Sequence, residues 1–207
     1  MDGTLAELAF RPQCEDASDY SGRKYGYSLT IMVINDDQKK IRAYLAGFPG
    51  CSHDNRVWKS MDQCQRSELY FSDLEYILCD TAFEPSNNAV PAYRAQPGFV
   101  QNADEKLFNT ALAKPRVMSE HVMGIWKGRF PWLRKIRMRV TDEKKSWKKI
   151  LKYIDATIVL HNMIIDFGGD KDSNIYDPDD DLAAMDDADR IPEEDILGLP
   201  VPPGAPR

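Results

Sequence analysis

Two β-favouring runs around a short polar loop constrain the fold of this chain most. Residues 25–35 contain the run Ser-Leu-Thr-Ile-Met-Val-Ile, and residues 41–48 run back after the turn Asn-Asp-Asp-Gln-Lys. Two such runs at this spacing are typical of a β-hairpin. A shorter apolar run at residues 4–10 precedes them, with Asp2 at its very beginning. The first part of the chain therefore predicts three antiparallel strands.

The rest of the chain alternates helical and strand-like patterns. After Pro49-Gly50, Ser52 or Asp54 can cap a helix that runs through Cys64. Asp54 could instead lie near a functional site, but a role as helix cap is the favoured interpretation. The remaining predicted elements are a buried strand at 76–79, an edge strand at 89–93, helices at 104–112 and from Pro115, and a long helix at 144–167.

This order predicts an α/β fold with a ribonuclease-H-like mixed sheet, in which three antiparallel strands are followed by parallel strands with flanking helices. In that arrangement the first and fourth strands lie side by side. Asp2 and Asp80 then fall on neighbouring strands, and Glu120 lies on a helix that crosses the sheet. Three carboxylates from two strands and a helix are suited to holding two Mg²⁺ ions for phosphodiester chemistry.

Each carboxylate also has a simpler interpretation. Asp2 could belong to an ordinary Asp-Gly turn, and Asp80 could end a strand by capping a turn. Glu120 could face solvent, although its apolar neighbours Val122 and Trp126 predict a largely buried helix. A buried carboxylate without a partner is costly, and a metal ion would remove that cost. The three residues are thus candidate catalytic and metal-binding groups.

The three histidines are weaker candidates. His53 precedes Asp54 and is ambiguous, while His121 is adjacent to Glu120. Two-metal chemistry favours hard oxygen ligands, so His121 is interpreted as a packing or hydrogen-bonding residue. His161 and Asn162, in the long helix, are likewise predicted to be structural.

The net charge of −6 conceals an asymmetry along the chain. Residues 114–152 hold 13 Lys and Arg against three acids, whereas residues 166–207 hold 13 acids against three bases. The basic part is suited to DNA phosphates. The candidate DNA-binding residues are Lys127, Arg129, Arg134, Lys135, Arg137 and Arg139. The interleaved aromatics Trp126, Phe130 and Trp132 could stack on bases, but a core role is favoured.

Length and composition predict one folded domain over residues 1–167. Residues 168–207 are acidic and rich in Pro and Gly, which predicts a disordered C-terminal tail. That tail either solvates the protein or masks the basic surface. No apolar run is long enough for a membrane span, and no secretion leader is recognisable. The four cysteines are widely spaced, which indicates reduced thiols in an intracellular protein.

Several blocks of the sequence resemble the PIF/Harbinger-type DDE transposases. They are Asp2-Gly3-Thr4, then Tyr25-Gly26-Tyr27-Ser28, the block from Phe48 to Val57, Leu78-Cys79-Asp80-Thr81-Ala82-Phe83 with Pro91-Ala92-Tyr93, Phe108-Asn109, the block from Arg116 to Phe130, and Leu160-His161-Asn162. The block around Glu120 is the most specific. The blocks occur in the family's order over about residues 2–165.

This resemblance implies a divalent-metal-dependent DNA endonuclease with strand-transfer activity, whose triad is Asp2, Asp80 and Glu120. It implies Mg²⁺ or Mn²⁺ as the cofactor, DNA as the partner (transposon ends and target), a Myb-like partner protein, an oligomer and a nuclear location. In the family a helical DNA-binding region precedes this domain. No such region precedes Asp2 here, so we expect an N-terminally truncated member. The alternative expectation is an inactive, domesticated domain that binds DNA or protein.

Overall fold

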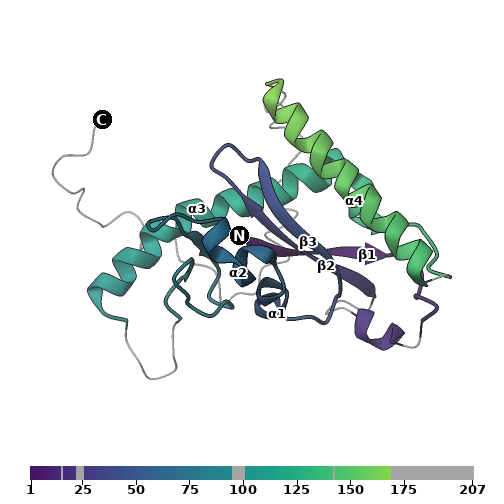
Figure 1. The fold of residues 1–207 in the computed structure, drawn as a ribbon, viewed down its shortest axis with the longest axis horizontal. Helices are drawn as coiled ribbons and strands as arrows, with labels where there is room; N and C mark the ends of the chain where they lie inside the picture. The colour runs from purple at the N-terminus through teal and green to yellow at the C-terminus, as the bar shows by residue number, and fades with distance from the viewer. Residues whose placement is uncertain (15, 22–25, 95–100, 142, 169–207) are drawn as a thin grey trace. The chain divides into compact units, whose positions relative to one another are not determined.

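The computed structural model contains a mixed sheet of four strands (Figure 1). The structure describes residues 1–14, 16–21, 26–94, 101–141 and 143–168. The strand order is β3-β2-β1-β6. The strands are β1 Asp2–Leu8, β2 Tyr27–Asn35, β3 Ile41–Pro49 and β6 Lys135–Ile136. β1, β2 and β3 are antiparallel, and β6 pairs in parallel with β1. The predicted hairpin, the three antiparallel strands and the mixed α/β class are confirmed.

The alternation of side chains along β2 separates two hydrophobic cores. Leu29, Ile31 and Val33 belong to a core on one face of the sheet, whereas Met32 belongs to a core on the other face. Successive side chains of a strand point to opposite faces, so an apolar run such as this one is expected where both faces are covered.

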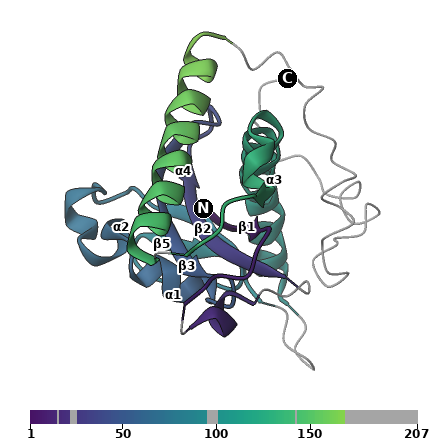
Figure 2. The same ribbon diagram turned by 90° about the vertical axis from the view of Figure 1, so that its right-hand side faces the viewer.

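Two long helices form the first core with the sheet. α3 spans Ala103–Arg129 and α4 spans Glu143–Asp166, and Figure 2 shows both beside the strands. Trp126 of α3 and Ile154 of α4 are completely buried in this core. Phe130 and Trp132 pack against its margin, so the three aromatics serve packing, as the sequence favoured.

Polar contacts fix α4 against β3. The side chain of Asn162 accepts a bond from the Ile41 N–H and donates one to the Ile41 carbonyl, each 2.9 Å long. The buried His161 places Nε2 3.0 Å from the Lys39 carbonyl oxygen. The predicted structural role of His161 and Asn162 is therefore confirmed.

The opposite face of the sheet carries short elements. They are α1 Asp54–Lys59, α2 Asp62–Gln65, β4 Ile77–Cys79 and β5 Ala89–Pro91. Val57 and Trp58 of α1 pack with Met32 in the second core. The single helix predicted through Cys64 is two helices, because Met61 has an extended backbone between them. The strands β4 and β5 pair in parallel with each other in a separate two-stranded sheet.

The prediction of two separate helices, at residues 104–112 and from Pro115, was wrong. Pro115 lies inside a continuous helix of 27 residues and does not begin a new one. Proline removes one backbone hydrogen bond from a helix interior. Buried contacts on both sides, at Leu112 and at Val122, hold the axis through this position. A capping box between Asn102 and Glu105 fixes the start of the helix.

Three 3₁₀ turns complete the described elements: η1 Ala17–Tyr20, η2 Ser67–Leu69 and η3 Pro131–Leu133. All four cysteines are free thiols. Within the described ranges, the helices are too short or too polar to cross a membrane. The predicted disordered tail, residues 168–207, lies outside the described residues except for Gly168, which follows α4 in a left-handed conformation with φ of 76°.

Candidate metal centre at the start of β1

Asp2 opens β1 in a setting that disfavours its charge. Its carboxylate accepts a 2.8 Å hydrogen bond from the Gly3 N–H. Burial raises the pKa of Asp2 to about 6, and the negative charges of Asp54 and Asp80 add to the effect. A group that loses solvent beside like charges lowers its energy by binding a proton or a cation. Asp2 is thus a candidate ligand on physical grounds as well as by sequence pattern.

Asp80 directly follows β4 and reaches the same region. The amino group of Met1 donates a 2.8 Å bond to the Leu78 carbonyl of β4. This contact is what joins the start of β1 to β4, in place of the strand pairing that the sequence predicted. Asp80 forms an ion pair with Arg116 of α3, with 3.1 Å between Nη2 and Oδ1. The fourth strand therefore ends beside the first, and its terminal carboxylate already attracts a cation.

Asp54 is a third carboxylate at this position. It is the first residue of α1, whose N-cap is His53, and the His53 side chain makes no capping bond. The predicted capping role of Ser52 or Asp54 is therefore wrong. The carboxylate of Asp54 lies against Gly3, where an added Cβ would be 2.4 Å from Asp54 Oδ1. The reason is that α1 packs on the sheet and turns its first residue toward β1, which no local sequence rule reveals.

Glu120 is positioned by the path of α3 along β1. Ser119 Oγ donates a 2.8 Å bond to Asn35 Oδ1, at the end of β2 that pairs with the start of β1. Further along the helix, Lys127 Nζ donates a 3.0 Å bond to the Leu5 carbonyl. Glu120 is one helical turn beyond Arg116, and residues four apart share a helix face. The partly buried Glu120 therefore lies on the face of α3 that carries the contact to Asp80.

The carboxylates are grouped without forming a finished coordination shell. In the described part of the chain, no three His, Cys, Asp or Glu side chains are close enough to hold a metal ion as they stand. Asp2, Asp54 and Asp80 interact electrostatically, and Glu120 shares the α3 face of Arg116. The prediction that Asp2, Asp80 and Glu120 bind metal stays a prediction, and binding would require side-chain movement.

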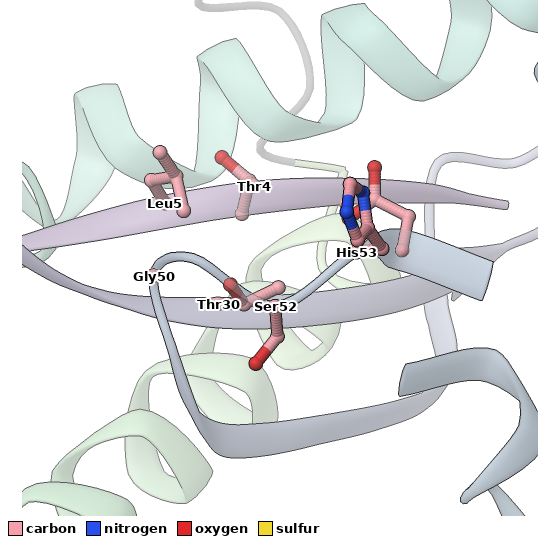
Figure 3. Close-up of a pocket in the computed structure, with 8 residues that line it drawn as sticks. Thr4, Leu5, Thr30, Gly50, Ser52 and His53 are labelled. Carbon is pink, nitrogen blue, oxygen red and sulfur yellow. The ribbon is translucent and has the colours of Figure 1, made fainter. Parts of the chain in front are cut away.

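A pocket of about 200 Å³ opens beside this group (Figure 3). The loop before α1 contributes Gly50, Ser52 and His53, and the strands contribute Thr4 and Thr30. The full lining is Gly3, Thr4, Leu5, Thr30, Gly50, Ser52, His53 and Asp54. Most of these residues offer hydroxyl, imidazole, carboxylate or backbone groups. The pocket therefore gives water and ions a polar route to Gly3 and Asp54.

The opposite end of β1 is basic. Leu8 pairs with Ile136 of β6, and the segment around β6 carries exposed cations. The exposed candidates are Arg134, Lys135, Arg137 and Arg139. The other two candidates are partly buried and contact the protein: Lys127 bonds to Leu5, and Arg129 lies 3.4 Å from His161 Nδ1. The six candidates thus divide into an exposed group of four, here called the basic edge, and a pair that also fixes helices.

The family model for the DDE superfamily endonucleases matches residues 1–162. The chain belongs to this family. Domains of this family are endonucleases that use divalent metals, and their substrate is DNA. The match spans the sheet, α3, most of α4 and all the carboxylates discussed above. Neither the curated proteins nor the solved structures include a match to this chain.

Proposed function

We propose that this chain is the catalytic domain of a PIF/Harbinger-type transposase, a Mg²⁺-dependent endonuclease that cleaves DNA and transfers strands. Asp2, Asp80 and Glu120 are the triad that holds two divalent ions, with Mn²⁺ able to replace Mg²⁺. The observation that carries the proposal is the meeting of Asp2 and Asp80 at the junction of β1 and β4. These residues are far apart in a chain that belongs to an endonuclease family.

The donor groups fit such ions chemically. Mg²⁺ prefers carboxylate oxygens and retains several waters, so it needs few protein ligands. Asp2 is a buried acid beside two like charges, and burial is the main cause of its raised pKa. Asp80 already accepts one cationic partner, Arg116. A divalent ion would replace that partner and neutralise the group.

Each residue then has a distinct task. When bound, two divalent ions activate the attacking water or 3′-hydroxyl and stabilise the leaving oxygen. Asp2, whose charge interacts with that of Asp80, would hold the ions from the start of β1. Asp80 would hold them from the end of β4. Glu120 would hold them from α3, on the helix face that Arg116 shares.

The basic edge is the proposed site for the DNA backbone. The strand β1 connects it to the acidic residues, and the six residue steps from Asp2 to Leu8 span roughly 20 Å. A duplex that contacts both places would present phosphates to the cations while one phosphodiester lies at the carboxylates. By the same family resemblance we propose a nuclear location, a Myb-like partner protein and an oligomeric active form.

A second candidate is a non-catalytic domain that keeps the fold for binding DNA or protein. One observation favours it. The carboxylates of the described residues are not at coordination distance, and Asp80 is paired with Arg116. Such a protein would bind DNA through the basic edge without cutting it.

Nicking of a supercoiled plasmid separates the two candidates. The transposase proposal predicts cleavage that requires Mg²⁺ or Mn²⁺ and stops with a chelator. Asp80→Asn and Glu120→Gln should each abolish it, because each removes a ligand. Asp62→Asn is the matched control, since Asp62 also opens a short helix but pairs with Arg66 on the surface. Cleavage that survives either triad variant rejects the triad, and plasmid binding without metal-dependent cleavage supports the second candidate.

A further inference from the structure

We infer that the exposed face of α4 binds the same face of a second copy of this chain, with the two helices antiparallel. This face, here called the α4 seam, consists of Tyr153, Ala156, Val159, Leu160, Met163 and Phe167. The inference names a surface for the oligomer of the proposed function, and to that extent it rests on that proposal. It uses neither the carboxylates nor the basic edge.

The second half of α4 is apolar on two faces. One face is buried in the first core through Ile154 and Ile158, while another exposes large hydrophobic side chains. From residue 156 to residue 165 the helix contains no Asp, Glu, Lys or Arg. A surface helix normally carries charged residues opposite the core, whereas a helix that is apolar all round is covered all round. The sequence of α4 therefore fits a helix with a partner on each face.

The spacing of the exposed residues is that of a coiled-coil helix. Tyr153, Ala156, Leu160, Met163 and Phe167 follow one another at intervals of three, four, three and four residues. Phe167 follows the last residue of α4 and continues its hydrogen bonding, with a 3.0 Å bond from its N–H to the Met163 carbonyl. Such intervals place apolar side chains in one stripe, which packs against an equivalent stripe of a second helix.

The α4 seam is large for a surface left to solvent. Its five large side chains are 47–84% exposed, which is on the order of 500 Å² of apolar surface. They are five of the fourteen exposed large hydrophobic residues in the described part of the chain. Figure 2 shows the last turns of α4 extending beyond the strands. Contiguous patches of this size mark interaction sites. Because a stable interface buries about 800 Å² per partner, we expect a reversible dimer.

Charges at the two ends of the seam favour the antiparallel arrangement. Lys152 precedes the seam and Asp166 lies near its end, and both side chains are exposed. Each lies seven residues from Val159, so antiparallel helices that cross at Val159 bring Lys152 of one copy to Asp166 of the other. A parallel pair would place each of these residues beside its own equivalent. Asp166 also pairs with Lys40, and a carboxylate can accept bonds from two cations.

Sedimentation equilibrium of the full chain tests the inference. We expect a monomer–dimer equilibrium with a dissociation constant on the order of micromolar. Leu160→Glu should weaken dimerisation by at least about 30-fold, because it buries one charge from each copy in the seam. Leu107→Glu is the matched control, since Leu107 is an exposed leucine of α3, and it should dimerise like the wild type.

Thiol cross-linking tests the orientation of the helices. With a short bifunctional thiol reagent, a mixture of Lys152→Cys and Asp166→Cys chains should form a covalent dimer. Neither variant alone should form it above the level of the wild type, whose own four cysteines are free thiols. Cross-linking of each variant with itself but not with the other overturns the antiparallel arrangement.

The remaining outcomes separate this inference from the proposed function. A wild type that stays monomeric up to about 100 µM overturns the inference, and so does a dimer that persists unchanged in Leu160→Glu. If Leu160→Glu does not fold, Phe167→Ser at the exposed end of the seam decides by the same criterion. A monomeric wild type that nicks plasmid leaves the triad standing. A dimer without metal-dependent cleavage leaves the α4 seam standing and rejects the nuclease.

Discussion

The two ends of β1 differ in how strongly they disfavour a charged side chain. At its start, Asp2 is partly buried beside other carboxylates, and the raised pKa shows that its charge is disfavoured there. At its other end, Glu7 and Lys135 are an exposed pair of neighbours on adjacent strands. Water stabilises charge at the second place but not at the first. The start of β1 would therefore be stabilised by a bound cation. Its other end lies beside exposed basic side chains that can bind DNA phosphates.

The comparison also explains why the two regions should respond to different measurements. A charge change at a buried position alters the free energy of folding, because the folded state lacks solvent there. A charge change at an exposed position has little effect on folding but alters long-range attraction to DNA. The predictions below test this separation, in order of decreasing expected effect.

The largest effect is expected at the basic edge. Replacing Arg134, Lys135, Arg137 and Arg139 together by Gln should lower DNA affinity by about 100-fold in 0.2 M salt, because up to four phosphate contacts are lost. The slope of log Kd against the logarithm of the salt concentration should decrease by up to about 3–4. Fluorescence anisotropy with labelled duplex DNA measures both. An unchanged slope would show that DNA binds elsewhere, and an unchanged unfolding temperature is the control for folding.

The next effect concerns Asp2 without metal. Its pKa is raised from 3.8 to about 6 in the folded state, so its contribution to stability is complete below pH 3.8 and is lost as the pH rises through 6. Asp2→Asn has no such loss and should be more stable than the wild type at pH 7 by about 1–3 kcal/mol. The difference should nearly vanish at pH 4. Urea unfolding in EDTA at both pH values measures this, and a less stable Asp2→Asn at pH 7 would contradict it.

A smaller effect is expected at Arg116. Its partly exposed ion pair with Asp80 contributes about 1 kcal/mol, so Arg116→Gln should destabilise the metal-free protein by that amount. The variant should also show a larger Mn²⁺-induced rise in unfolding temperature, because the ion no longer competes with the guanidinium for Asp80. Calorimetric scans with and without Mn²⁺ test both parts. A weaker Mn²⁺ response would show that Arg116 helps to position Asp80 for the ion.

The smallest effect is expected for Glu7→Gln, which is the matched control for Asp2→Asn on the same strand. Glu7 is exposed beside Lys135, so its neutralisation should change stability by less than about 0.5 kcal/mol at any pH between 4 and 7. The same urea experiment measures it. A larger pH-dependent change would mean that the two ends of β1 do not differ as described.

The sequence predicted those parts of the fold that local patterns determine. The hairpin of β2 and β3 follows from two β-favouring runs and a polar turn, and α4 follows from its apolar periodicity. The prediction of a break at Pro115 was wrong because tertiary packing outweighed the local preference. The parallel pairing of β4 with β5 agrees with the predicted parallel strands, but the predicted pairing of the fourth strand with the first was wrong, because β4 and β5 form a separate sheet and β6 pairs with β1.

The candidate site shows the same limit. Asp2 and Asp80 were predicted from strand ends and from the family resemblance, and the structure brings them together. Asp54 was interpreted as a helix cap, because its position before a helix is all that local sequence shows. Its approach to β1 depends on how α1 packs against the sheet. The one sequence signal for it is Gly3, a glycine inside a strand and next to an aspartate.

Isothermal titration calorimetry of the full chain with Mn²⁺ tests the central claim most directly. Two divalent ions at the start of β1 predict saturable binding with about two ions per chain for the wild type. Asp80→Asn should lose at least one of these sites, whereas Glu7→Gln should keep both. A wild-type chain that takes up no Mn²⁺, or an Asp80→Asn chain that binds it with unchanged stoichiometry and affinity, would contradict the account.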